Sequence, residues 1–458
     1  MKKVCVVGLG FVGSAMATAI AIATKNKKPI YKVFGIDLEN EQGTKRVKAI
    51  NDGIFPFNTD DKNLLSSFNR AVEQGNLNAT TDKSIYAEMD IIVVDIQLDI
   101  DYLNDEPQLE LGQFKTAINE IGAVAKVGAL IIIETTVPPG TCEKLVIPTL
   151  QEELNKRNLS SSDFLVAHSY ERVMPGNDYL ASITDYWRVF SGYNKKSGDA
   201  CEEFLNNVVN VKNYPLTRLT SPTASETAKV LENTYRATNI AFIEEWSKFA
   251  EEIGIDLFEV TDAIRVRPTH SNIRFPGFGV GGYCLTKDPT FAHASAGQLF
   301  GKTLDFPFSK LAVKVNHNMP LNVLSRFIKL LELDIEKCNI LVCGISYRQD
   351  VGDTRYSPSE TLVRKLIELK ANVVCHDPYV SYWEEMSINL PVNLPDAKEF
   401  DAVIFAVPHR QYIDLKLIPW AVGCKFIFDA NGLFTKEQRN LLRDNNIRVE
   451  SAGRGDGL

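Results

Sequence analysis

The stretch Val4-Cys5-Val6-Val7-Gly8-Leu9-Gly10-Phe11-Val12-Gly13 decides the fold class of this chain. It joins a short β-branched run to three glycines spaced as G-x-G-x-x-G, and an alanine-rich helical segment follows. A second strand, expected over residues 32–36, ends at Asp37. This order is typical of a dinucleotide-binding βαβ unit. The alternative is an ordinary strand–turn–helix unit whose glycines serve packing alone.

The glycine spacing predicts how a dinucleotide is held. Glycines permit a tight turn and a close approach of the backbone to a pyrophosphate, whose charge the helix N-terminus favours. Asp37 is expected to accept a hydrogen bond from a ribose 2′-hydroxyl and to repel a 2′-phosphate, so NAD is predicted in preference to NADP. The predicted contacts are Gly8, Gly10, Phe11, Val12, Gly13 and Asp37.

Composition limits the class of protein. The 458 residues predict two or three domains, and the net charge of −8 argues against nucleic acid as a partner. Eight scattered cysteines predict reduced thiols and a cytoplasmic protein, and six histidines without a ligand cluster predict no metal site. The apolar stretch over 4–24 resembles a signal peptide or a membrane span, but its glycine spacing favours a soluble domain with no membrane partner.

Alternating strands and helices predict an α/β fold with a doubly wound, Rossmann-type sheet in the N-terminal part and a second Rossmann-like domain at the C-terminus. Between them, one long helix is expected from Ala224 to Gly254, with apolar residues on more than one face. The predicted domains are residues 1–212, 213–325 and 326–458. The predicted buried, parallel strands are Val4–Val7, Lys32–Ile36, Asp90–Asp95, Leu130–Ile133, Phe164–Ala167 and Arg188–Ser191, then Ile340–Gly344, Val373–Cys375, Val403–Ala406, Phe426–Phe428 and Ile447–Val449.

Cys284 follows four glycines within eight residues and precedes Lys287-Asp288. A thiol in such a loop, with a cation three residues on, is a candidate nucleophile of low pKa. The alternative is a buried cysteine at the end of a turn. Asp288-Pro289 also fits the start of a helix, with the aspartate as its N-cap.

Further polar motifs follow predicted strands, at the sheet edge where ligands bind in such folds. They are Glu134-Thr135-Thr136, the segment from Tyr170 to Gly176 with Glu171 as a candidate base, and a loop with Arg348 and Arg355 that suits phosphate. Each has a structural alternative: a Thr-Pro turn, a surface ion pair of Glu171 with a lysine, and internal Asp–Arg pairs. Lys229 and Asn233 share one face of the long helix and need a polar partner if buried.

Taken together, these motifs resemble the nucleotide-sugar 6-dehydrogenases, the UDP-glucose and GDP-mannose dehydrogenase family. The resemblance covers nearly the whole chain, and its sharpest element is Gly-Gly-x-Cys-x-x-Lys-Asp. It implies oxidation of a sugar C6 alcohol to a carboxylate with two NAD, a nucleotide-binding last domain with a UDP-sugar favoured, and a homodimer built on the long helix.

The resemblance also implies roles for residues. Cys284 forms a thiohemiacetal and then a thioester, Lys229 and Asn233 stabilise the oxyanion, Glu171 and Asp288 handle protons and water, and Thr136 orients the water. Additional cofactor contacts are Thr135, Thr136, Lys287 and Arg355. The implied substrate contacts are Glu171, Arg172, Val173, Met174, Lys229, Asn233, Arg267, Phe275, Gly277, Gly281, Tyr347 and Arg348.

Three positions depart from the family pattern. Tyr347-Arg348 replaces Phe-Lys, Asp95-Ile96-Gln97-Leu98 replaces Thr-Pro-Thr, and Tyr283 replaces His or Ser. The Glu-Arg-Val-x-Pro-Gly form is closer to members acting on UDP-N-acetylhexosamines than to UDP-glucose enzymes. Two alternatives stay open: a two-electron β-hydroxyacid dehydrogenase, which needs neither Cys284 nor a third domain, and a non-catalytic NAD-binding sensor.

Overall fold

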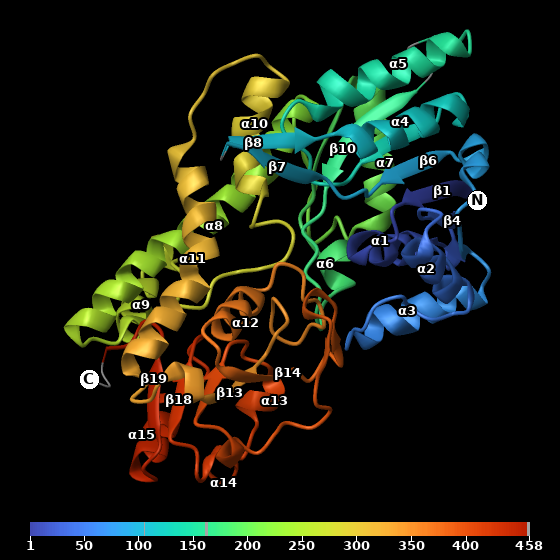
Figure 1. Ribbon diagram of the computed structural model, residues 1–458. Coiled ribbons are helices and arrows are strands. Elements are labelled where there is room, and N and C mark those ends of the chain that lie inside the picture. Colours follow the sequence, from blue (N-terminus) through green and yellow to red (C-terminus); the bar gives the residue numbers. More distant parts are fainter. Residues whose placement is uncertain (105, 161–163, 456–458) are drawn as a thin grey trace. The chain divides into compact units, whose positions relative to one another are not determined.

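The computed structural model of the chain describes residues 1–104, 106–160 and 164–455 (Figure 1). The chain divides into two compact units. The first comprises Met1–Glu232 and Thr290–Asp305, and the second comprises Asn233–Pro289 and Phe306–Leu458. Within the described ranges, no helix is long and apolar enough to cross a membrane. The apolar N-terminal stretch is divided between strand β1, Lys2–Val7, and helix α1, Phe11–Ala21.

The first unit is built on an eight-stranded sheet in the order β12-β11-β10-β9-β6-β1-β4-β5 (Figure 1). All six predicted strands are present, shifted by at most three residues at either end. Their neighbours β5 and β12 were not predicted. The strands are β1, β4 Tyr31–Ile36, β5 Leu77–Thr80, β6 Ile91–Val94, β9 Leu130–Ile133, β10 Leu165–Tyr170, β11 Val189–Gly192 and β12 Thr217–Arg218.

One prediction for this sheet is wrong. Strand β11 runs antiparallel to β10, with Ala167 opposite Gly192, whereas the other predicted strands pair in parallel. A parallel pair of strands needs a long crossover connection, usually a helix. The link from β10 to β11 contains only the short helix α6, Ala181–Thr184, so the two strands pair antiparallel. A buried apolar run does not encode strand direction, so the pattern alone did not reveal this.

Helices cover both faces of the first sheet, as a doubly wound fold requires. Buried residues of α1, α3 and α7 form one apolar core with the strands, and those of α4, α5 and α10 form the other. The remaining elements of this unit are α2 and two small hairpins. The bounds are α2 Glu41–Asn51, α3 Lys62–Glu73, α4 Gly112–Val124, α5 Ile147–Lys156, α7 Lys195–Val208, α10 Phe291–Gln298, β2 Thr24–Lys25, β3 Lys28–Pro29, β7 Asp99–Leu103 and β8 Glu106–Glu110.

The second unit contains a five-stranded parallel sheet in the order β14-β13-β17-β18-β19 (Figure 1). All five predicted strands are present. Residues of α11 and α12 pack on one face and those of α13, α14 and α15 on the other. The bounds are β13 Asn339–Cys343, β14 Asn372–His376, β17 Ala402–Phe405, β18 Phe426–Asp429, β19 Arg448–Ser451, α9 Leu257–Arg265, α11 Pro307–Leu330, α12 Pro358–Glu368, α13 Arg410–Ile413, α14 Leu417–Ala421, α15 Lys436–Asp444, β15 Tyr382–Trp383 and β16 Ile388–Asn389.

The predicted long helix is α8, Pro222–Ile253. Its start agrees with the Ser-Pro-Thr signal, and it ends one residue before Gly254, which has a φ of +82°. A glycine in this left-handed conformation is a common helix terminator because it carries no Cβ. Because α8 is continuous from Pro222 to Ile253, Lys229 and Asn233 lie one turn apart on the same face.

Candidate active site

The glycine loop after β1 has the geometry that a dinucleotide requires. Gly8 has a φ of +95°, and its N–H donates to the Ile36 carbonyl at 2.8 Å. A Cβ on Gly13 would lie 1.8 Å from the Gly8 oxygen, whereas a Cβ on Gly10 would meet no atom within 4 Å. Helix α1 has no side-chain cap. The loop thus offers open space at a helix N-terminus, which fits a pyrophosphate.

Asp37 follows β4 and is buried beside this loop. Its Oδ1 accepts a hydrogen bond from the Leu38 N–H at 2.8 Å, and its Oδ2 lies 3.1 Å from Nη1 of Arg46. Arg46 was not predicted, although its place nine residues on, in α2, makes it a candidate phosphate contact. The negative charge of the carboxylate neutralises Arg46, a cation of the kind that suits a 2′-phosphate.

The sheet edge after β6 and β9 is densely hydrogen-bonded. The Thr135 hydroxyl donates to the Ile96 carbonyl at 2.8 Å, so it anchors the backbone, whereas Thr136 stays partly exposed. Glu134 and Arg188 form an ion pair of 2.6 Å with both side chains buried. Burial, and then the charges of Glu134 and Glu171, raise the pKa of Asp95 well above its ordinary value. Arg188 was not predicted as a site residue; its pairing across 54 positions has no local signal.

Glu171 and Lys229, both predicted, are partners. The Lys229 Nζ donates to the Glu171 carbonyl at 2.6 Å and lies 3.7 Å from its Oε1, and both side chains are nearly buried. The second oxygen, Oε2, accepts from the Val173 N–H. Burial, followed by the Lys229 charge, lowers the pKa of His168 to about 3. Glu171 does pair with a lysine, but the pair is buried and not on the surface.

In the second unit, Cys284 lies at the start of a turn. Its carbonyl accepts from the N–H groups of Lys287 at 3.3 Å and Asp288 at 2.9 Å. The Asp288 carboxylate is buried and accepts from Asn233 Nδ2 at 2.8 Å and from Lys287 Nζ at 3.0 Å. Asp288 is therefore the polar partner that a buried Asn233 needs. Asp288 begins a 3₁₀ turn, Asp288–Thr290, and the N-cap of the following helix α10 is Thr290, so the predicted N-cap role of Asp288 is wrong.

The cysteine loop packs against the predicted phosphate loop of the same unit. The Gly282 N–H donates to the Arg355 carbonyl at 3.0 Å, and a Cβ on Gly281 would lie 2.3 Å from the Tyr356 oxygen. Only glycine allows this approach. Burial, followed by the negative charge of Asp353, raises the pKa of Tyr347 to about 12. Segments seventy residues apart thus meet.

The other predicted residues have mixed surroundings. The Arg355 side chain donates to the Asp353 carboxylate at 2.9, 3.2 and 2.7 Å, which is the internal pair that was the structural alternative. Arg348 and Arg267 are exposed, and Met174 is largely so. Arg172 pairs with Glu232 at 3.0 Å.

Gly277 lies beside Asn431, whose Oδ1 accepts the Phe278 N–H at 3.0 Å. Asn431 and Asn316, which brackets Val280 with two hydrogen bonds, were not predicted.

All eight cysteines carry free thiols, and they fall into two groups. Cys284 is exposed, whereas the other seven are buried, and burial raises the pKa of every one of them. The thiolate is the reactive form of cysteine. The buried-turn alternative for Cys284 is therefore wrong.

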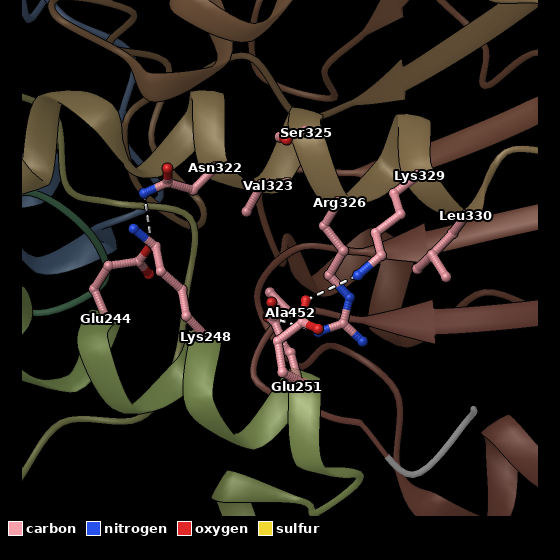
Figure 2. Close-up of a pocket in the computed structure, with 11 residues that line it drawn as sticks. Glu244, Lys248, Glu251, Asn322, Val323, Ser325, Arg326, Lys329, Leu330 and Ala452 are labelled. Carbon is pink, nitrogen blue, oxygen red and sulfur yellow. Dashed lines mark hydrogen bonds and ion pairs between the residues drawn. The ribbon is translucent and has the colours of Figure 1, made fainter.

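A separate pocket of about 340 Å³ lies in the second unit along α8 and α11 (Figure 2). It contains none of the predicted site residues. Burial raises the pKa of Glu244 in its wall to about 7. The cations of the lining each have a carboxylate within 4 Å: Lys248 with Glu244, Arg326 with Glu251, and Lys329 with Glu252.

Comparison with known proteins agrees with this geometry along the chain. Residues 2–208 match the NAD-binding domain of the UDP-glucose/GDP-mannose dehydrogenase family, residues 223–318 its central domain, and residues 341–436 its UDP-binding domain. The chain belongs to this family. A UDP-N-acetyl-D-mannosamine dehydrogenase of Methanocaldococcus jannaschii is 32% identical over 443 residues, which are 95% of this chain and 93% of the relative.

Solved structures of the family have the same fold. A UDP-D-ManNAc dehydrogenase from Pyrococcus horikoshii aligns with a TM-score of 0.82 at 26% identity, covering 99% of this chain and 100% of that one. An NDP-N-acetyl-D-galactosaminuronic acid dehydrogenase from Methanosarcina mazei aligns with a TM-score of 0.78 at 26% identity, and the alignment covers 100% of this chain and 96% of that one. The family assignment identifies the chain as an NAD-dependent nucleotide-sugar dehydrogenase.

Proposed function

We propose that this dehydrogenase oxidises the C6 hydroxymethyl group of a UDP-N-acetylhexosamine to a carboxylate in two successive steps, through Cys284. The observation that supports it most is the exposed thiol of Cys284, next to a turn whose Asp288 is held by two donors. The names of the relatives and the Glu-Arg-Val-x-Pro-Gly form of residues 171–176 support the N-acetylhexosamine.

NAD, when bound, supplies the hydride acceptor. The residues that would hold it are Gly8, Gly10, Gly13 and Asp37, where the open loop and the acid after β4 fit its pyrophosphate and ribose. Thr135, Thr136, Lys287 and Arg355 are assigned to it by the family resemblance.

Loss of a hydride and a proton from the C6 alcohol leaves an aldehyde. The Cys284 thiol adds to the aldehyde carbon and its proton passes to the oxygen, which gives a thiohemiacetal. Loss of a second hydride and the hydroxyl proton leaves a thioester, and water hydrolyses it to the carboxylate and the free thiol. Lys229 stabilises the oxyanion, a role that the burial of its ammonium and its hydrogen bond to the Glu171 carbonyl support. One such donor typically lowers the activation barrier by ~3–4 kcal/mol. Asn233 keeps Asp288 in place, Glu171 and Asp288 exchange protons with substrate and water, and Thr136 orients the water.

A dimer built on α8 belongs to the proposal. Tyr235, Phe242, Trp246, Phe249 and Ile253 form an apolar stripe along this helix, and each side chain is about half exposed. Such a stripe on a long helix is typical of an interface. The free thiols support a cytoplasmic location.

A substrate screen tests the proposal. UDP-glucose, UDP-galactose, GDP-mannose, UDP-N-acetylglucosamine and UDP-N-acetylmannosamine are compared by kcat/KM, with NADH followed at 340 nm. The proposal predicts the highest value for one of the two N-acetylhexosamines and two NADH for each sugar consumed. A preference for UDP-glucose or GDP-mannose would contradict the substrate class, and one NADH per sugar would contradict the four-electron reaction.

A further inference from the structure

Three polar side chains stand in a row at the carboxyl edge of the first sheet, on strands that pair with one another. Asp95 follows β6, Glu134 follows β9, and Ser169 lies near the end of β10. Each comes directly after one of three residues that the sheet register aligns, namely Val94, Ile133 and His168. Neighbouring strands of a sheet are about 4.8 Å apart, so side chains of this row that point to the same face are neighbours.

The three side chains do point to one face of the sheet, the face that α1 covers. Side chains alternate along a strand, and two residues before each of the three stands a residue of the apolar core shared with α1, namely Val93, Ile132 and Ala167. A Cβ on Gly13 of α1 would lie 3.4 Å from Asp95 Oδ2. Arg188, whose Nη1 donates to Glu134 at 2.6 Å, also contacts the Met16 sulfur of α1 at 3.7 Å. The row therefore lies beneath the first turns of α1.

This row is short of hydrogen-bond donors. Asp95 Oδ2, Glu134 Oε2 and Ser169 Oγ are buried, and none of them has a hydrogen-bond partner within residues 1–104, 106–160 and 164–455. Arg188 reaches only the other oxygen of Glu134, Oε1. Buried polar atoms without a partner are costly. A proton on one of the two carboxyl groups, donated to the other, supplies a partner for both oxygens.

The charges around the row also require a proton. Three carboxyl groups face two cations: Glu134 pairs with Arg188 at 2.6 Å, and Glu171 lies 3.7 Å from Lys229. In the described part of the chain, no ion pair includes Asp95. Two adjacent buried carboxyl groups do not both ionise. Because Arg188 keeps Glu134 charged, the proton belongs on Asp95, whose pKa is raised by burial and then by the charges of Glu134 and Glu171.

The remaining ionisable groups near the row do not change this count. Helix α1 has no ionisable side chain. His168 precedes Ser169 and so points to the opposite face, where its Nδ1 lies 2.7 Å from the Ser225 hydroxyl. The Cys201 thiol of α7 is buried, and burial raises its pKa, so it stays neutral.

The carboxyl group of Asp95 also borders the glycine loop. A Cβ on Gly8 would lie 2.5 Å from the Asp95 carbonyl oxygen, so the two backbones touch. A negative charge on Asp95 would repel a pyrophosphate bound to this loop. We propose that Asp95 and Glu134 share one proton, and that NAD binds the glycine loop more tightly when the pair holds this proton than when it is lost. The second half of this proposal rests on the proposed cofactor site, whereas the first half does not.

Infrared spectroscopy of the full-length protein without NAD, at neutral pH, tests the shared proton. The C=O stretch of protonated carboxyl groups should be weaker in Asp95→Asn than in the wild type, because one acid group is removed. Asp377→Asn is the matched control in the second sheet. The pKa of Asp377 lies below its ordinary value despite burial, because of its bonds to His409 and the backbone, so this variant should keep the wild-type band. An equal band in the wild type and Asp95→Asn would overturn the shared proton.

Calorimetric titration with NAD, at neutral and at mildly alkaline pH, tests the coupling. The NAD affinity of the wild type should fall about tenfold or more as the pH rises, because loss of the proton restores the charge of Asp95. In alkaline buffers of different ionisation enthalpy, the wild type should take up part of a proton on binding NAD. Asp95→Asn is neutral at every pH, so it should take up no proton and lose far less affinity. If Asp95→Asn does not fold, Asp95→Thr, which restores the residue of the family pattern, replaces it.

The two measurements distinguish this proposal from the proposed cofactor site. An equal loss of NAD affinity with pH in the wild type and Asp95→Asn would overturn the coupling. A purely structural role of Asp95 is also overturned or supported here, since it would change the affinity by the same factor at both pH values. The infrared band does not depend on NAD, so a failure of the cofactor site leaves the test of the shared proton intact.

Discussion

The two parallel sheets begin with the same local geometry and then diverge. Gly8 follows β1 with a φ of +95°, and Gly344 follows β13 with a φ of +93°. Each glycine donates its N–H at 2.8 Å to the carbonyl of the last residue of the neighbouring strand, Ile36 in one sheet and His376 in the other. An aspartate comes directly after that strand in both sheets, Asp37 and Asp377.

The difference is what fills the space beyond the glycine. In the first sheet α1 begins at Phe11, three residues after Gly8, with no side-chain cap. In the second sheet the helix does not begin until Pro358, and Asp377 Oδ2 accepts from the N–H groups of Ile345 and Ser346 at 2.8 and 3.0 Å. The Asp377 carboxylate thus accepts hydrogen bonds from backbone N–H groups of the kind that would otherwise bind a pyrophosphate. The same topology therefore suits a dinucleotide in the first unit. In the second unit, any ligand has to be bound by the long loop that precedes α12.

The largest effect should come from closing the first glycine loop. A methyl group in Gly13→Ala would lie 1.8 Å from the Gly8 oxygen, so the turn has to open. We expect NAD affinity to fall about a hundredfold or more, roughly 3 kcal/mol, measured by calorimetry. The matched change, Gly344→Ala, places a Cβ 2.5 Å from Val407 and should lower the Tm without weakening NAD binding. Wild-type NAD affinity in Gly13→Ala would contradict the assignment of the loop.

The two aspartates should respond in opposite ways. Asp37→Ala removes the ribose acceptor and releases Arg46, so the preference in kcat/KM for NAD over NADP should shrink about tenfold or more. Asp377→Ala leaves two amides and the buried His409 without their acceptor, which should cost about 3 kcal/mol of unfolding free energy and leave the cofactor preference unchanged. If Asp377→Ala instead changed the cofactor preference, the contrast between the sheets would fail.

The long loop of the second sheet gives a third test. Arg355→Ala should weaken NAD binding about tenfold in calorimetry, because a phosphate-directed fork is lost, while the Tm stays close to that of the wild type. The opposite result is informative, since Arg355 is bonded to Asp353. A large drop in Tm with intact affinity would show that this pair is structural.

A smaller effect is expected in acid. Burial alone would raise the pKa of Asp377, but the hydrogen bond with His409 and those from the backbone lower it overall. A carboxylate with a depressed folded-state pKa contributes stability above its unfolded pKa and loses it as the pH falls through the folded one. Unfolding free energy should therefore decline in acid more steeply for the wild type than for Asp377→Asn, measured by denaturant titration. Parallel pH profiles would contradict this role.

The fold was largely predictable because most strands are short apolar runs with β-branched residues and the glycine turns have fixed spacing. The edge strand β5, Leu-Asn-Ala-Thr, has a single β-branched residue and so gives a weak signal, and the direction of β11 depends on its connection. The residue types of the site were predictable as well. Their pairing was not: Lys229 with Glu171, Asn233 with Asp288 and Asp37 with Arg46 are tertiary contacts, and local sequence does not specify them.

The thiol of Cys284 is the centre of the proposed reaction, and counting NADH tests it most directly. Wild-type protein with UDP-N-acetylmannosamine or UDP-N-acetylglucosamine should yield two NADH per sugar nucleotide. Cys284→Ala should bind NAD and the sugar nucleotide but form uronate and NADH at a rate lower by orders of magnitude, while Cys338→Ala, which removes a buried thiol, should keep the two-NADH yield. Near-wild-type production of two NADH per sugar by Cys284→Ala would contradict covalent catalysis.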